Sequence, residues 1–428
     1  MDNPIGSEIY NLAEKLFPIC RSLTGDGVRQ TLNIMREECP SLTLFEVPTG
    51  TAAFDWVVPK EWEIRDAYIK DLEGSTVLSF KDSNLHVVGY SAPFNRELSR
   101  EELLKMIHTL PDKPTLIPYV TSYYKEYSGF CMAFNDVQNL NKDRYRAVIE
   151  SELKDGSLTY GEILIPGKSE KEIFFSSNIC HPTLANNELS GPCLSLYLAK
   201  RAIAQSRSSR YSYRFIFIPE TIGSLVYMSR NLEKMKENII AGFVVTCAGD
   251  NRSYSYLSSR RGDTLADRAA KNTLNFTHQD YKSYPYLERG SDERQYCAPG
   301  IDLPVCSLMR SKYGEYPEYH TSADNMELIS PEGFEGSYAL YCKVIDSLEN
   351  NRTYKAVFLG EPQLGKRDLY PTVSYSGSAA GVRDMMNLLA YADGEVDLIG
   401  ISDIIKVPMD ELSRLAIKLE SAGLLERK

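Results

Sequence analysis

The sequence contains little of what several classes of metal site and secreted fold require. Its 428 residues include five histidines and nine cysteines, and the cysteines form no C-x-x-C pair. This spacing does not suggest a thiolate zinc cage, and the odd number does not suggest a disulfide framework. Any bound metal must therefore be held by histidines and carboxylates.

The chain also lacks an excess of positive charge and a long apolar run. Its formal net charge is -10, and no local cluster of Lys and Arg reverses it, so we expect no nucleic-acid partner. The first residues, Met1 to Pro4, are polar, and no run reaches the length of a membrane span. We therefore expect a cytoplasmic protein with no membrane partner. The length predicts several domains, or one large domain with an insertion.

Apolar runs and helical patterns alternate between residues 160 and 350. The short runs are typical of strands that are buried on both faces, and they predict an α/β fold with helices on both sides of a sheet. The strand-like runs are residues 163–165, 173–175, 215–218 and 242–245, and the helical patterns between them are 191–204 and 224–235.

Two other regions have a different texture. Residues 51–156 carry short β-like runs with aromatics, which predicts an inserted, mostly β domain between the two parts, 1–50 and 157–352, of the α/β domain. Residues 353–428 end in helices with a break at 406–409, after which Asp410 is placed to cap the last helix. This pattern predicts a winged-helix-like domain. The last helix has mixed charge, which favours packing or a homodimer over DNA binding.

Three groups of polar side chains follow apolar strands of the α/β segment. His181 follows one strand, with Glu188 in the polar loop beyond it; Glu220 follows the next strand, and His320 a later one. Ligands gather at the carboxyl edge of open α/β sheets, and imidazole with carboxylate is a donor set that zinc accepts. Simpler interpretations are an exposed loop histidine and a glutamate that stabilises the first turn of a helix.

The order of these landmarks resembles that of the zinc aminopeptidases and glutaminyl cyclases. The resemblance covers roughly residues 1–50 and 160–350, and its landmarks are His181, residues 186–191, Glu220 with Gly223 and Ser224, the Ser291–Asp292 turn, and His320 with Thr321. It implies a phosphorylase-like mixed sheet and a zinc-dependent hydrolase of peptide or amide bonds. The chain looks closest to a bacterial branch with an inserted β domain and a C-terminal winged helix.

The sequence departs from that family at several acidic metal ligands. Thr183 stands two residues after the first histidine, where the family has an Asp, and Asn186 or Asn187 takes the place of a bridging Asp. Pro219 precedes Glu220 where the family has two glutamates, and Thr246 stands near a strand end where it has another Asp. We therefore expect one zinc ion per chain rather than two.

The expected ligands of that ion are His181, Glu188 and His320, with Glu220 as general base on the bound water and Asp292 supporting or coordinating. Asp324 is a candidate partner of His320, and Asn187 a candidate contact for substrate or ligands.

Three more residues have open roles. Arg260 and Arg261 suit either a clamp for a substrate carboxylate or surface salt bridges, and Tyr319 either a pocket wall or loop packing. The alternative to a hydrolase is a catalytically altered relative that binds a ligand or serves in assembly, in polysaccharide or secondary-metabolite biosynthesis.

Overall fold

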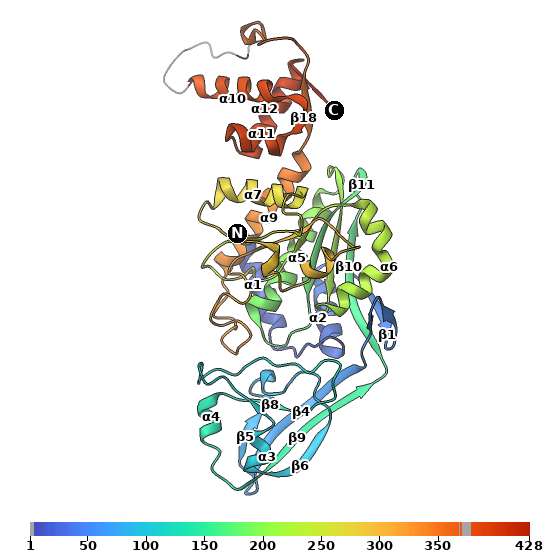
Figure 1. Ribbon diagram of the computed structural model, residues 1–428, viewed down its shortest axis with the longest axis vertical. Coiled ribbons are helices and arrows are strands. Elements are labelled where there is room, and N and C mark those ends of the chain that lie inside the picture. Colours follow the sequence, from blue (N-terminus) through green and yellow to red (C-terminus); the bar gives the residue numbers. More distant parts are fainter. Residues whose placement is uncertain (1–3, 368, 370–377) are drawn as a thin grey trace. The chain divides into compact units, whose positions relative to one another are not determined.

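A computed structural model describes residues 4–367, 369 and 378–428 (Figure 1). The chain divides into two compact units, one of residues 1–262 with 282–338 and the other of residues 263–281 with 339–428. The finer division at residues 50, 157 and 352 stays a prediction.

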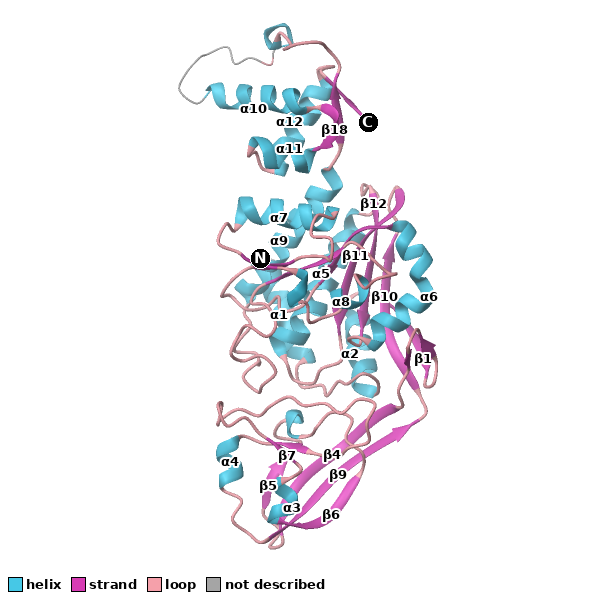
Figure 2. Ribbon diagram, in the orientation of Figure 1, coloured by secondary structure: helices cyan, strands magenta, loops and turns pink. Residues whose placement is uncertain are grey.

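The first unit is built on an eight-stranded mixed sheet (Figure 2). The four central strands are parallel to one another. Antiparallel pairing occurs toward both edges, between β10 and β12 on one side and between β16 and β14 on the other. In spatial order, the strands are β1 (Thr43–Pro48), β10 (Ser157–Ile165), β12 (Tyr211–Ile218), β11 (Ser169–Asn178), β13 (Ile239–Val244), β16 (Val305–Met309), β14 (Ser255–Leu257) and β15 (Lys282–Tyr284).

Helices cover both faces of this sheet, which confirms the predicted fold class. Helix α5 packs on β10, β11 and β12, and α1 packs against α5. Helix α6 packs on β11 and β13 from the other side of the sheet (Figure 1). The helices of this unit are α1 (Ile5–Leu16), α2 (Asp26–Glu38), α5 (Ser190–Gln205), α6 (Ile222–Asn238) and α8 (Glu293–Tyr296), whereas α9 (Pro331–Asn350) begins in the first unit and continues into the second.

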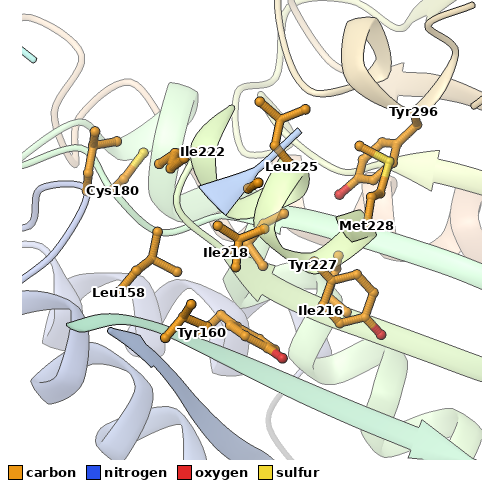
Figure 3. Close-up of a cluster of buried hydrophobic side chains, with 14 of the residues drawn as sticks. Leu158, Tyr160, Cys180, Ile216, Ile218, Ile222, Leu225, Tyr227, Met228 and Tyr296 are labelled. Carbon is orange, nitrogen blue, oxygen red and sulfur yellow. The ribbon is translucent and has the colours of Figure 1, made fainter. Parts of the chain in front are cut away.

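The core between the sheet and α6 is closely packed. Figure 3 shows Ile216 and Ile218 of β12 beside Leu225 and Met228 of α6, and these side chains are at most 5% exposed. Cys180 belongs to the same cluster. The apolar cluster therefore reaches the strand end at which the candidate site begins.

Helix α5 starts unusually close to the sheet. Its first turn is preceded by a π-helical turn, Ala185–Leu189, and a Cβ on Gly191 would lie 2.1 Å from the carbonyl oxygen of Val245. Only glycine permits this approach. Single π-turns are frequent at functional sites, and this one carries Asn187 and Glu188.

The inserted region has its own sheet and its own apolar cluster. Four antiparallel strands lie in the order β5 (Thr76–Ser79), β4 (Glu61–Asp71), β9 (Arg144–Lys154) and β6 (Phe94–Ser99). The short elements around them are β2 (Ala52–Ala53), β3 (Trp56–Val57), α3 (Arg100–Leu104), β7 (Ile107–His108), β8 (Phe130–Cys131) and α4 (Phe134–Gln138).

The second unit contains a three-stranded antiparallel sheet and a bundle of short helices. Helix α12 begins at Met409 after Pro408, with no side-chain cap, so Asp410 lies within the first turn and the predicted Asp410 cap was wrong. The elements are α7 (Leu265–Thr277), β17 (Thr353–Ala356), α10 (Ser378–Tyr391), β18 (Asp393–Asp397), α11 (Leu398–Ile405), α12 (Met409–Ser421) and β19 (Leu425–Arg427). Within the described residues, no helix has the length and apolar character to cross a membrane.

Candidate functional site

Polar side chains from separate strand ends converge on one cavity of about 490 Å³. His181 follows β11, Glu220 follows β12, Arg294 lies in α8, and His320 lies in the loop after β16. All four line the cavity. Because β11 and β12 are parallel, their carboxyl ends meet at the same edge of the sheet.

His181 is held by a buried carboxylate. Glu188 Oε2 lies 2.7 Å from His181 Nδ1, and Glu188 Oε1 accepts hydrogen bonds from the backbone amides of Cys180 and His181, the latter at 2.8 Å. Burial opposes a charge on the imidazole, but Glu188 and the Cys180 thiol raise the pKa of His181 well above its ordinary value. The Glu188 contact fixes the ring and leaves Nε2 directed toward Glu220, 3.8 Å away.

A buried arginine fixes the backbone of the same loop. Arg21 Nε and Nη2 donate to the carbonyl oxygens of His181 and Pro182, at 2.9 and 3.1 Å, and Nη1 donates to that of Leu16 at 2.8 Å. The side chain is 1% exposed. No sequence pattern indicates this role, because Arg21 lies 160 positions from His181.

Glu220 lies between two cationic groups. His181 Nε2 is 3.8 Å from one of its oxygens, and Arg294 Nη2 is 3.9 Å from the other. Burial raises the pKa of Glu220, while His181 and Arg294 oppose that rise. A carboxylate with a raised pKa suits the role of a general base or acid near neutral pH.

Asp292 supports the turn that carries Glu220. Its Oδ1 accepts hydrogen bonds from the Thr221 amide at 2.8 Å and from Ser224 Oγ at 3.1 Å, and its Oδ2 is buried and has no hydrogen-bond partner among the residues that the structure describes. Burial and the neighbouring Glu220 carboxylate raise the pKa of Asp292 to about 8. The structure thus places Asp292 next to Glu220, in a supporting position.

The ring of His320 contacts the side chain of Asn187. His320 Nε2 lies 3.1 Å from Asn187 Oδ1, and burial lowers the pKa of His320 to about 3. Asp324 does not touch His320: its carboxylate accepts from the amides of Asn186 and Asn187, at 2.6 and 3.1 Å, and from Tyr316. Asp324 therefore acts on His320 only by fixing the turn that carries Asn187.

Two residues of this site have strained backbones. Thr221, which follows Glu220, has φ 64°, and His320 has φ 54°. The left-handed region is unfavourable for residues with a Cβ, above all for a β-branched one. Such outliers cluster at functional sites, which marks both segments as functional candidates.

The inserted region supplies a wall of the cavity that the sequence did not predict. Tyr119 lies with its ring 5.0 Å from the rings of both His181 and His320, and its hydroxyl is 3.1 Å from that of Tyr123. The Tyr119 amide donates to the carbonyl oxygen of His320 at 2.9 Å. This bond ties the inserted region to the histidine loop.

Comparisons with known proteins agree with this architecture. Residues 10–351 match the family described as a domain of unknown function, DUF4910, and residues 352–427 match a winged helix-turn-helix domain. The chain belongs to the DUF4910 family. The winged-helix prediction is confirmed as well.

This member of the family is similar to proteins from two bacteria. It is 46% identical over 93% of its length to 91% of a Clostridium acetobutylicum protein named "Putative polysaccharide biosynthesis protein with aminopeptidase-like domain". A crystal structure titled as a putative peptidase from the same species is 43% identical, with a TM-score of 0.92 over 99% of this chain and 96% of that one. A Bacillus subtilis zinc aminopeptidase, BSAP, is 13% identical with a TM-score of 0.60, covering 81% of this chain and 96% of that one. The predicted relation to the zinc aminopeptidase superfamily is thus confirmed at the level of fold.

The structure does not gather every residue predicted for the site of this DUF4910 protein. Glu188 Oε1 accepts from backbone amides and Oε2 lies 2.7 Å from His181 Nδ1, on the side of the ring away from Glu220. Glu188 is thus grouped with Cys180 and His181 rather than with His320, and its role as a zinc ligand stays a prediction. Arg260 and Arg261 both pair with Asp302 and do not line the cavity. They therefore form surface salt bridges.

Tyr319 stacks on the ring of His320, with ring centroids 3.8 Å apart, and packs edge-on against Tyr316. Tyr319 therefore packs against His320 and is not one of the side chains that line the cavity.

Proposed function

We propose that this protein is an aminopeptidase-like hydrolase that cleaves a peptide or amide bond, with Glu220 as the general base. The observation that carries the proposal is the position of Glu220, which shares a cavity with His181 and His320 and lies 3.8 Å from His181 Nε2. In that position, Glu220 can take a proton from a water molecule and later return it to the leaving amine. The fold shared with zinc aminopeptidases supports the reaction class.

The donor groups at the cavity fit one zinc ion, although with a changed ligand set. His181 has its Nδ1 on a carboxylate, as metal-binding histidines do, and its Nε2 faces the cavity. The ring centroid of His320 lies 5.6 Å from that of His181, and His320 Nε2 is 3.1 Å from the side-chain oxygen of Asn187. We propose His181, His320 and Asn187 as the residues that would hold the ion, with Glu188 orienting His181. A zinc ion would lower the pKa of a water molecule and polarise the scissile carbonyl.

The test compares hydrolysis by the wild-type protein, Glu220→Gln and Glu315→Gln on a panel of peptides, N-acyl amino acids and N-acyl amino sugars. The name of the Clostridium relative supports including the amino sugars. We expect Glu220→Gln to lower turnover by about 10²- to 10⁴-fold and the exposed Glu315→Gln to leave it unchanged. Hydrolysis that survives in Glu220→Gln would refute the role of Glu220.

A second candidate function is ligand binding without catalysis, in an assembly or polysaccharide pathway. It is favoured by the neutral amide of Asn187, which meets His320 at 3.1 Å in the segment where the family resemblance implies a bridging aspartate and this chain has Asn186 and Asn187. Elemental analysis of metal in the wild-type protein, His181→Ala and His320→Ala separates the two functions. About one zinc ion per chain, lost in both variants, supports the hydrolase; ligand binding without metal or turnover supports the alternative.

A further inference from the structure

The cavity contains a cation that the mechanism above does not use. Arg294 lines the cavity, and within the described part of the chain its only side-chain hydrogen bond is from Nη2 to Thr221 Oγ1, at 2.6 Å. Its Nε is buried and has no hydrogen-bond partner among these described residues. A guanidinium has five N–H donors in a planar fork that matches a carboxylate. Arg294 therefore keeps donors for a group that enters the cavity.

The position of Arg294 relates this cation to the reaction. Glu220 lies between His181 Nε2, at 3.8 Å, and Arg294 Nη2, at 3.9 Å. A substrate whose carbonyl group lies beside Glu220 and His181 therefore extends to Arg294 within a few ångströms. Among the side chains that line the cavity, Glu220 is the one carboxylate and Arg294 the one permanently charged cation.

This charge pattern is unfavourable for a free amino terminus. An ammonium group in the cavity would meet the cation of Arg294, and its one carboxylate partner there would be the base itself. A carboxylate, in contrast, would find an arginine with unused donors. Like charges that meet in a partly desolvated pocket discriminate strongly between ligands.

Aromatic side chains cover another side of the same cavity. Trp56, Tyr119, Tyr123 and Tyr124, all from the inserted region, line it together with Leu23 and Ile222. Trp56 and Tyr124 pack edge to face, with ring centroids 5.4 Å apart. Flat aromatic faces in a concave pocket suit a planar or ring-shaped apolar group.

We propose that this cavity selects amides that carry a carboxylate and an apolar or ring-shaped group, with Arg294 as the carboxylate-binding residue and the inserted region as the wall for the ring. An N-blocked amino acid is the simplest member of this class, and a peptide with a free amino terminus is excluded from it. The inference rests on the proposed function for the bond that is cleaved, but binding is measurable without cleavage.

The binding test uses two probes that have no amide bond and carry groups of opposite charge at the end of the same phenylpropyl skeleton, 3-phenylpropanoate and 3-phenylpropylamine. Isothermal titration of the full-length protein is expected to show tighter binding of the anion. Arg294→Gln should weaken anion binding by about tenfold or more and should tighten amine binding, because it removes the like charge, and Arg294→Lys should restore part of the loss of anion binding. Arg289→Gln is the matched control, because Arg289 is exposed and stacks on Tyr286 outside the cavity. Thermal unfolding verifies that each variant is folded, and Arg294→Lys decides the test if Arg294→Gln does not fold.

Preference for the amine, or anion binding that Arg294→Gln does not weaken, overturns the inference. Turnover of N-acetyl-phenylalanine and of phenylalaninamide is then compared to separate the two proposals. Anion selectivity without hydrolysis of either compound refutes the proposed function and leaves the inference intact. Hydrolysis with a preference for phenylalaninamide refutes the inference and leaves the proposed function intact.

Discussion

Asp292 beside the cavity and Asp397 in the C-terminal unit both accept hydrogen bonds from the start of a helix. The pKa of Asp292 is nevertheless raised, whereas the pKa of Asp397 is lowered. Asp397 accepts from the Gly400 amide at 3.0 Å and pairs with Arg268, and these contacts lower its pKa despite burial. Asp292 accepts from the Thr221 amide, but burial and Glu220 raise its pKa to about 8.

Arg268 of the C-terminal unit and Arg21 beside the cavity also differ in the groups that accept their hydrogen bonds. Arg268 donates to a carboxylate, whereas Arg21 donates its hydrogen bonds to three carbonyl oxygens and, at 3.5 Å, to the Thr31 hydroxyl. The C-terminal unit pairs opposite charges, as stable folds do. The strand edge buries two carboxyl groups side by side, and this burial raises the pKa of both; it also keeps a cation on neutral oxygens. Such perturbed groups are typical of functional sites.

Arg21→Ala is expected to have the largest effect on stability. It leaves the carbonyl oxygens of Leu16, His181 and Pro182 buried without their donor, at a total cost of about 3–5 kcal/mol. Arg268→Ala should cost less, about 1–2 kcal/mol, since Arg268 is 35% exposed. Urea unfolding measures both, with the exposed Arg36→Ala as control. Equal losses for Arg21 and Arg268 would contradict the contrast between the regions.

The same contrast explains which parts of the molecule the sequence could predict. The apolar runs of β11 and β12 are local signals, and parallel strands bring their ends together, so His181 and Glu220 were found from the sequence. The role of Arg21 and the approach of Tyr119 to His320 depend on contacts between segments far apart in the chain. No local pattern encodes such contacts.

Glu188 shows a second limit. Its residue type and spacing suit a metal ligand, but the structure directs both oxygens to His181 and to backbone amides. Whether a carboxylate binds a metal or orients a ligand depends on an ångström-scale direction, which residue spacing does not specify.

The second-largest effect is expected for Asn187→Asp, which should strengthen metal binding. The substitution places a charged oxygen beside His320 Nε2, where the amide oxygen now lies 3.1 Å away. Because added ligand charge strengthens cation binding, zinc affinity should rise by about tenfold to a hundredfold. Competition with a chromophoric chelator measures the affinity, and Asn33→Asp on the exposed face of α2 is the control. An unchanged affinity would remove Asn187 from the ligand set.

Asp397→Asn should destabilise the C-terminal unit by about 1–2 kcal/mol at pH 7, because it removes the charge that pairs with Arg268. The pKa of Asp397 is lowered in the folded state, so its contribution is present above its ordinary pKa of about 4 and is lost as the pH falls through the lowered value. Urea unfolding at pH 7 and pH 3 should show the difference between wild type and variant shrinking in acid. Asp410→Asn, whose side chain is 82% exposed, should have no effect at either pH.

Asp292→Asn is expected to change the free energy of unfolding least at pH 7. Its dependence on pH should be opposite to that of Asp397→Asn. With a pKa of about 8, the folded protein keeps Asp292 protonated at neutral pH, and asparagine resembles that neutral form, so the loss should stay below about 1 kcal/mol. Between about pH 4 and pH 8, the folded state holds a proton that the unfolded state releases. Stability of the wild type therefore falls as the pH rises, by up to about 1.4 kcal/mol per pH unit, and the variant lacks this fall. Urea unfolding from pH 5 to pH 9 should show Asp292→Asn gaining on the wild type as the pH rises; a variant that loses ground instead would mean that Asp292 is a charged residue of the same kind as Asp397.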